Sequence, residues 1–317
     1  MWWSIIGVLK LTKSELGLLE LLSKHERLGM TDIGVELGLS PPRVSQLVSS
    51  LKEQNLVNDS KRGFMKHVSL SEAKHATLFR KLTIEYEHMN LITLLSGANL
   101  EVLSAINCLH LINRKEIHEK TLVSESSIAK SLKNLRQIGV VQKEPTYYIP
   151  ARFETLEEFV AEFRHDMNRH IAQRFSTDSL ITWECNHEFI VECKEEKDEK
   201  DFLPTGISAF WRYGVQLFVT KWHYLYSPFT TKINLEDAIL HSILENTATN
   251  IAPTLIVWKK NEEKLDLGYL KRKSEKYGVL NKIEHMINYF RNEGEQRASG
   301  FPTWPEFMDK AKEYESL

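Results

Sequence analysis

The polar side chains best suited to chemistry in this sequence line the outer face of a short helical segment. Apolar Val44, Val48 and Leu51 recur at i, i+4 and i+7, so they face inward and leave a polar face opposite them. That outer face comprises Ser40, Pro42, Arg43, Gln46, Ser49 and Ser50. In the major groove, an arginine pairs with guanine and a glutamine with adenine through two hydrogen bonds each. We therefore expect this face to contact double-stranded DNA.

A second segment, 84 residues further along the chain, presents a similar face. Its polar positions are Ser124, Ser126, Ser127, Lys130, Lys133 and Asn134. This face is basic and rich in hydroxyl groups, and no acid follows Glu125 within it, so it suits the phosphate backbone of DNA. We expect Ser124 to cap the helix and the whole face to contact DNA.

The two segments belong to an internal repeat. At the constant offset of 84 residues, apolar positions coincide across three successive segments without a gap. The coinciding pairs are Leu16 with Leu100, Leu19 with Leu103, Leu22 with Ile106, Ile33 with Ile117, Val44 with Ile128, Val48 with Leu132 and Leu51 with Leu135. A chance alignment of two amphipathic helices would not extend over three segments, so a duplicated domain is indicated.

Each repeat predicts three helices followed by a β-hairpin. In the first repeat, Thr12 is placed to cap the first helix, with Glu15 at the capping-box position. We expect Thr31 to cap the second helix and Gly38 to end it. Ser40 is expected to cap the third helix, which has a proline at its first position, where the missing N–H costs nothing. The short turn between the last two helices predicts a helix-turn-helix.

The predicted hairpin differs between the repeats. In the first repeat two strands within residues 56–70 flank a basic tip, as in a β-wing. The wing residues expected to touch phosphates are Lys61, Arg62 and Lys66. The second wing, residues 140–149, is shorter, and Glu144 cancels Lys143 at its tip. Because phosphate contacts supply much of the affinity for DNA, we expect the first repeat to bind DNA better.

Residues 10–82 resemble winged-helix transcription regulators of the MarR or ArsR type, which are prokaryotic and here most similar to archaeal ones. Residues 68–74, Val-Ser-Leu-Ser-Glu-Ala-Lys, are similar to the segment that closes the wing in those regulators, with Ala73 where glycine is usual. The resemblance implies sequence-specific binding of duplex DNA, with the third helix in the major groove. The second repeat, residues 99–149, resembles another winged helix. Winged helices also serve as protein-interaction modules that never touch DNA, which is the alternative function.

Residues 71–96, between the repeats, predict one long helix. Its apolar stripe consists of Phe79, Leu82, Tyr86 and Met89, at 3-4-3 spacing. Such a stripe packs either against the winged helices or against a second subunit as a coiled-coil-like seam. A homodimer through this helix is expected, because paired half-sites increase specificity, although the tandem repeat supplies the same pseudo-symmetry within one chain.

The second half begins with a predicted helix at residues 155–174, followed by one predicted strand at residues 181–193. Within that strand Cys185, His187 and Cys193 share the apolar stripe, so we interpret them as core rather than as zinc ligands, and we expect no metal. Glu192 and Lys194 resemble the Glu-x-Lys pair of restriction-type nucleases. With Asp178 as a further carboxylate, they would form a Mg²⁺-dependent nuclease, which is a second alternative.

The remainder of the chain predicts an α+β region. Helices are predicted within 205–214, 234–245, 253–259, 265–277, 279–291 and 303–314, with short strands near 215–220 and 224–226. An aromatic cluster forms either a core or a ligand pocket, and its members are Phe210, Trp211, Tyr213, Trp222, Tyr224 and Tyr226. Residues 235–240 and 267–271 make this region distantly similar to the effector part of AbiEi-type antitoxin regulators, from which no residue role is carried over.

Charge and composition support this division of the chain. The 317 residues carry a net charge of −2, but residues 1–150 carry +4 and the remainder −6, so the first half is the better partner for a polyanion. No uncharged run approaches the ~18 residues that a membrane span needs, and the first residues lack a secretory leader, so we expect a cytoplasmic protein without a membrane partner. No catalytic triad, P-loop or dinucleotide fingerprint is present, and we expect neither enzymatic activity nor a cofactor.

We therefore predict a mainly α-helical protein with small β-sheets. Residues 1–96 form the first winged helix with its long linker helix, and residues 97–153 form the second. Residues 154–317 form a C-terminal α+β domain for sensing an unidentified effector or for association. The predicted function is that of a transcription regulator that binds double-stranded DNA through tandem winged helices.

Overall fold

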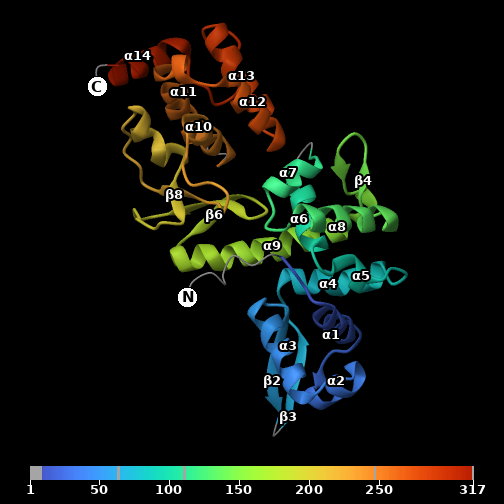
Figure 1. Ribbon diagram of the computed structural model, residues 1–317. Helices are drawn as coiled ribbons and strands as arrows, with labels where there is room; N and C mark the ends of the chain where they lie inside the picture. Colours follow the sequence, from blue (N-terminus) through green and yellow to red (C-terminus); the bar gives the residue numbers. More distant parts are fainter. Residues whose placement is uncertain (1–8, 63–64, 110–111, 246–247, 316–317) are drawn as a thin grey trace. The chain divides into compact units, whose positions relative to one another are not determined.

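The computed structural model describes residues 9–62, 65–109, 112–245 and 248–315 (Figure 1). The chain separates into two compact units, one of residues 1–108 and 112–170, and the other of residues 171–317 together with 109–111. The chain passes from the first unit to the second inside a long helix, between His170 and Ile171. The sequence had suggested a division ahead of this helix, at residue 154.

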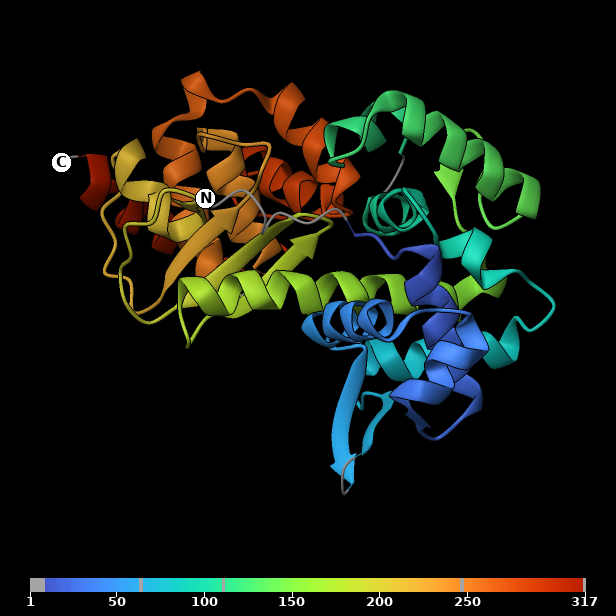
Figure 2. The ribbon, with the colours of Figure 1, turned by 60° about the horizontal axis from the view of Figure 1, so that its bottom comes forward.

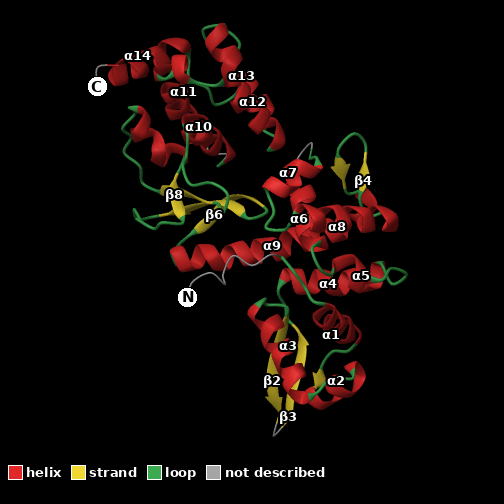
Figure 3. Cartoon of the chain, viewed as in Figure 1, coloured by secondary structure: helices red, strands yellow, loops and turns green. Residues whose placement is uncertain are grey.

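The first repeat forms a winged helix-turn-helix. Its elements are α1 (Lys13–Lys24), β1 (Leu28–Gly29), α2 (Met30–Leu37), α3 (Pro41–Glu53), β2 (Val57–Arg62) and β3 (Met65–Leu70). The three strands form an antiparallel sheet in the order β1-β3-β2, and β2 with β3 makes the wing at the lower end of Figure 3.

Local capping explains where these helices begin and end. Thr12 and Glu15 form the expected reciprocal capping box, and Gly38 ends α2 in the left-handed conformation. Ser40 is the N-cap of α3, although its hydroxyl makes no capping hydrogen bond. The predicted cap at Thr31 is wrong, because Gly29 pairs with His67 in the sheet and its extended backbone starts α2 at Met30 instead.

The second repeat has the same order of elements. They are α6 (Asn99–Cys108), α7 (Arg114–Glu119), α8 (Glu125–Ile138), β4 (Gln142–Lys143) and β5 (Tyr147–Tyr148). Ser124 caps α8 as expected, since its hydroxyl accepts a hydrogen bond from the Ser127 amide at 3.4 Å. The wing is short, with only two residues paired in each strand.

The repeat inferred from the sequence is confirmed by burial. All seven coinciding apolar pairs are buried, with relative exposure of 5% or less for every member. The register extends to the backbone: Asn55 after α3 and Gly139 after α8 are 84 residues apart, and both adopt positive φ angles of 54° and 82°. Such left-handed residues end helices, and glycine and asparagine tolerate this conformation best.

The predicted single helix over residues 71–96 is wrong. The chain forms α4 (Lys74–Glu85) and α5 (Leu91–Leu95), separated by a break in which Asn90 caps α5 by accepting a hydrogen bond from the Thr93 amide at 2.8 Å. The hydroxyl of Tyr86 donates to the carbonyl oxygen of Arg152 at 3.1 Å, which ties the break to a distant part of the same unit.

The apolar stripe of this segment is used within the chain. Phe79, Leu82 and Tyr86 are buried, and the rings of Phe79 and Phe159 lie 5.7 Å apart. The predicted homodimer seam through residues 71–96 is therefore wrong, because most of its apolar surface packs inside one molecule.

Helix α9 (Glu154–Phe175) joins the two repeats, and Figure 2 shows it in yellow-green beside the blue α3. The side-chain amide of Asn55 donates to Asp166 of α9 at 3.3 Å. Arg164 of α9 forms a buried ion pair of 2.8 Å with Glu101 of α6. Both repeats are thus attached to one helix of the same compact unit.

The second unit contains an antiparallel sheet in the order β6-β7-β9-β8. Its strands are β6 (Leu180–Cys185), β7 (Glu188–Cys193), β8 (Phe202–Pro204) and β9 (Trp222–Tyr226). The predicted single strand over 181–193 is wrong, because Asn186, with a φ of 53°, turns the chain into a hairpin. The predicted strand near 215–220 is also wrong, and β8 had not been predicted.

Helices cover the sheet, and most of their predicted positions are confirmed to within two residues. They are α10 (Leu235–Leu244), α11 (Ile251–Lys260), α12 (Leu267–Lys276), α13 (Leu280–Arg291) and α14 (Trp304–Glu315). Short 3-10 helices occur at Ala151–Phe153, Gly206–Tyr213, Ala248–Asn250 and Glu262–Lys264. Phe210 and Tyr224 are fully buried, so the aromatic cluster is mainly core, although Trp211 remains exposed. No helix among the described residues combines the length and apolarity needed to cross a membrane.

Candidate nucleic-acid interface

The outer face of α3 is exposed as the sequence predicts, with one exception. Ser40, Pro42, Arg43, Gln46 and Ser49 are all exposed. Ser50 is half-buried and donates a hydrogen bond of 2.6 Å to Glu15 of α1, so it stabilises the domain rather than facing outward. The guanidinium of Arg43 donates to the side-chain oxygen of Gln46 at 3.3 Å, which holds the two expected base readers side by side.

The wing of the first repeat contains a cation pair held by an acid. Asp59 of β2 forms ion pairs with Lys52 of α3 and with Lys66 of β3, the latter at 2.9 Å. Hydrogen bonds from these two lysines lower the pKa of Asp59 to about 2. The carboxylate therefore stays ionised near neutral pH and neutralises part of the charge on the wing.

Two further wing residues were predicted to touch phosphates. Lys61 is exposed, and no ion pair of its side chain occurs among the described residues. The side chain of Arg62 lies outside the described part of the chain, although its backbone pairs with Met65. Lys61 is thus the wing cation best placed to meet a phosphate.

The outer face of α8 is more basic than that of α3. Lys130 and Lys133 are exposed, and Asn134 is half-buried beside them. At the start of the helix, the hydroxyl oxygens of Ser124 and Ser126 lie 3.1 Å apart, and those of Ser124 and Ser127 lie 3.0 Å apart. This hydroxyl cluster occupies the end of α8 that corresponds to the Arg43 end of α3.

The fold adds basic residues that the sequence reasoning missed. A cleft of about 420 Å³ beside α8 is lined by Arg114, Ala129, Leu132, Lys133, Arg136, Gln137 and Tyr147. Three of these residues are cationic and none is acidic, so the cleft favours an anion such as a phosphate. Arg136 lies three residues after Lys133 and was within reach of helical spacing. Arg114 comes from α7, where its guanidinium donates to the carbonyl oxygen of Glu125 at 3.2 Å, and only the tertiary structure brings it here.

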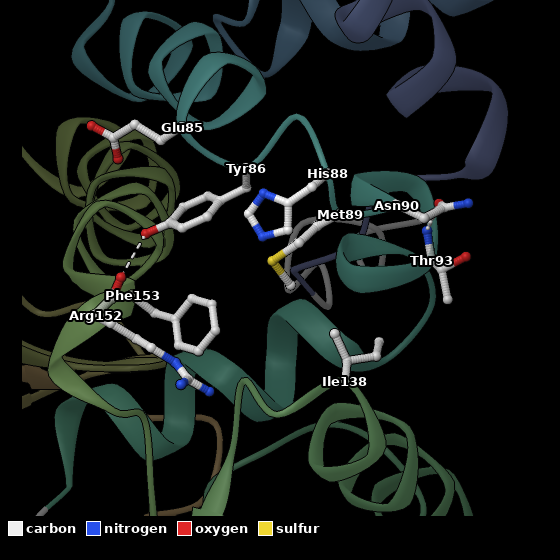
Figure 4. A pocket seen from close by; sticks show the side chains of 9 residues that line it. All are labelled: Glu85, Tyr86, His88, Met89, Asn90, Thr93, Ile138, Arg152 and Phe153. Atoms are coloured by element: carbon white, nitrogen blue, oxygen red, sulfur yellow. Dashed lines mark hydrogen bonds between the residues drawn. The ribbon is translucent and has the colours of Figure 1, made fainter.

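A second cleft lies between the break after α4 and the end of α8, within the same unit (Figure 4). It measures about 570 Å³ and is lined by Glu85, Tyr86, His88, Met89, Asn90, Thr93, Ile138, Arg152 and Phe153. Figure 4 shows the ring of Tyr86 beside that of Phe153, with centroids 5.7 Å apart. Acidic, basic and apolar groups are mixed here, so the lining does not select one kind of ligand.

The three residues of the nuclease alternative have separate partners. The carboxylate of Asp178 accepts hydrogen bonds from Ser176 and from the backbone amide of Lys194, which lower its pKa. Glu192 instead pairs with Lys221 and lies 3.6 Å from the buried His223. Cys185 and Cys193 are buried, as expected for core positions. Among the described residues there is no group of three histidines, cysteines or acids that could hold a metal ion.

Comparison with known families assigns both ends of the chain. Residues 9–62, which span α1 to the first strand of the wing, match the model of the MarR family. Residues 199–316, which include β8 to α14, match a family described as HVO_2833_C, C-terminal. No curated protein matches the chain.

Proposed function

Because the chain begins with a MarR-type winged helix, we propose that it is a transcription regulator that binds double-stranded DNA through both repeats. The observation that carries the proposal is the exposed surface of the two third helices. On α3 and on α8, the side chains that point outward are polar or basic, and each helix follows a helix-turn-helix corner.

The two surfaces suit different parts of DNA. Arg43 and Gln46 on α3 are the side chains able to read guanine and adenine edges. Lys130, Lys133 and Arg136 on α8 offer positive charge without a comparable set of base-reading amides, so they suit phosphates. We therefore assign sequence preference mainly to the first repeat and salt-dependent affinity mainly to the second.

Within this proposal the tandem repeat supplies two DNA contacts from one chain. A homodimer is not required for paired half-sites, because both helices belong to the same compact unit. The proposal includes a cytoplasmic location and no enzymatic activity. The C-terminal unit, which matches a different family model, has the role of sensing or association.

A selection of bound sequences from random duplexes tests the proposal. The full chain is expected to enrich a short motif and to bind it with an affinity that falls steeply as salt rises. A variant that combines Arg43→Ala with Gln46→Ala is expected to lose the motif while retaining salt-dependent binding. If the folded protein binds no duplex at low salt, the repeats are protein-interaction modules and the proposal is wrong.

A further inference from the structure

A cavity in the C-terminal unit lies among helices α10, α11 and α13 and the segment that precedes α14 (Figure 1). It measures about 490 Å³, within the range of pockets that bind small organic molecules. Its apolar lining comprises Ile243, Ile251, Met286, Ala298 and Phe301. These residues come from four separate segments, so the cavity is a product of the tertiary structure.

The polar groups in the inner wall of the cavity are already paired. The hydroxyl groups of Ser242 and Thr254 lie 2.8 Å apart, and that of Thr254 also donates to the carbonyl oxygen of Asn250 at 2.5 Å. The side-chain amide of Asn250 donates to Glu245 at 2.6 Å. Because these groups satisfy one another, the inner wall suits the apolar part of a ligand.

The outer edge of the cavity is basic. Lys282 and His285 lie one turn apart on α13, both are exposed, and both line the cavity. No aspartate or glutamate belongs to the lining. A negative group at this edge would meet an ammonium and an imidazole without a facing carboxylate, whereas a positive group would meet the ammonium unfavourably.

We propose that this cavity binds an organic anion with an apolar body, such as an alkyl or aromatic carboxylate. The apolar body lies against Met286 and Phe301, and the carboxylate lies at the edge beside Lys282 and His285. The inference concerns the C-terminal unit alone and does not depend on DNA binding.

Three probes that share one tail test the preference for an anion. Octanoate, 1-octanol and octylammonium differ only in the charge of the head group, and their binding to the full chain is measured by calorimetry without DNA. We expect octanoate to bind most tightly and octylammonium most weakly, with the difference shrinking at high salt because exposed charges are screened. Equal binding of all three probes, or no binding of octanoate, would overturn the proposal.

Variants locate the bound probe. Lys282→Gln is expected to weaken octanoate about two- to fivefold, as for one exposed ion pair, and to leave 1-octanol unchanged. Lys271→Gln on α12, an exposed lysine outside the cavity, is the matched control and should change neither probe. Ala298→Trp, in the segment before α14, should fill the cavity and abolish both. If Lys271→Gln weakens octanoate as much as Lys282→Gln does, the site is not this cavity.

Discussion

The two winged helices of this protein share a core and differ on their surfaces. Every coinciding apolar pair is buried in both repeats, and the left-handed residue that ends the third helix falls at the same register. In contrast, the wing has six-residue strands in the first repeat and two-residue strands in the second. The comparison teaches that one packing pattern can support two different polar surfaces, because outward positions do not contribute to the core.

One difference reaches into the interior. Gly17 in the first repeat corresponds to Glu101 in the second, at the offset of 84 residues. Glu101 is fully buried, pairs with Arg164 at 2.8 Å and accepts a hydrogen bond from the Leu9 amide at 2.7 Å. The second repeat is therefore tied to α9 and to the start of the first repeat by a buried charge that the first repeat lacks at the equivalent position.

Removing this charge should have the largest effect. Glu101→Ala leaves Arg164 buried without its carboxylate partner, so we expect the free energy of unfolding to fall by about 3–5 kcal/mol. Urea denaturation of the full chain measures it, and a combined Glu101→Leu, Arg164→Met variant should recover most of the loss. At the equivalent position, Gly17→Ala should instead stabilise the protein by about 0.5–1 kcal/mol, because Gly17 is a helix-interior glycine whose added Cβ meets only Leu37 at 3.8 Å. A Glu101→Ala loss below that of an ordinary surface substitution would contradict the assigned role.

Reversing charge on the second repeat should have the next largest effect. Lys130→Glu combined with Lys133→Glu is expected to weaken DNA binding about 60-fold at 0.1 M salt, because each lost phosphate contact removes about 0.9 from the slope of log K against log salt. Fluorescence anisotropy over a salt series measures both quantities. Lys271→Glu combined with Lys310→Glu changes the net charge of the chain equally and is the matched control. If the control lowers affinity as strongly, net charge rather than α8 determines binding.

Single substitutions in the first repeat should separate base reading from phosphate contact. Arg43→Ala is expected to relax preference at one base pair by about 1–3 kcal/mol, because it removes a pair of hydrogen bonds to guanine. Lys61→Ala should weaken all sequences alike and lower the salt slope by about one contact. Parallel affinity measurements on the selected motif and on single-base variants distinguish these outcomes. Identical behaviour of the two variants would show that the role assignments are wrong.

The smallest effect is expected from the acid in the first wing. Asp59→Asn releases Lys52 and Lys66 and removes one negative charge, so DNA affinity should rise by a few fold, about the value of one exposed ion pair. The same anisotropy assay measures this change. A decrease in affinity would mean that Asp59 orients the lysines toward DNA instead of competing with it.

The same substitution predicts a pH dependence of stability. The folded-state pKa of Asp59 is about 2, below the model value of 3.8, so its contribution to stability is present above pH 3.8 and is lost as the pH falls through 2. The difference in Tm between the original chain and Asp59→Asn should therefore be constant from pH 7 to about 5 and shrink between about 4 and 2. Because the pair is partly exposed, the difference should be small and decrease with salt.

Several features follow from short-range patterns and were predictable. Helical spacing placed Val44 and Leu51 in the core, and the capping residues Thr12 and Ser124 begin their helices as expected. The duplication was visible because periodic burial leaves the same apolar register in both copies. The exposed face of α3 was predictable for the same reason, since outward positions are those that the inward ones leave over.

Other features depend on partners far along the chain. The helix over residues 71–96 breaks where Tyr86 reaches Arg152, 66 residues away, and the spacing of its stripe gives no sign of that contact. The alternating pattern over 181–193 continues through Asn186, so a period of two residues could not distinguish one strand from a hairpin. Ser50 satisfies the outward spacing of α3, yet Glu15 of α1 holds it at the domain surface.

The amino-acid sequence by itself determined the duplicated core, the helix starts and the polar faces of α3 and α8, because spacing and capping act within a few residues. Only the tertiary structure decided which polar groups those faces expose, as with Arg114 joining α8 from α7 and Asp59 holding two lysines of the wing. It also decided the cavity beside Lys282, since its walls come from segments about 60 residues apart. The physical reason is that charge pairing and cavity shape depend on distances between elements, which local spacing does not specify.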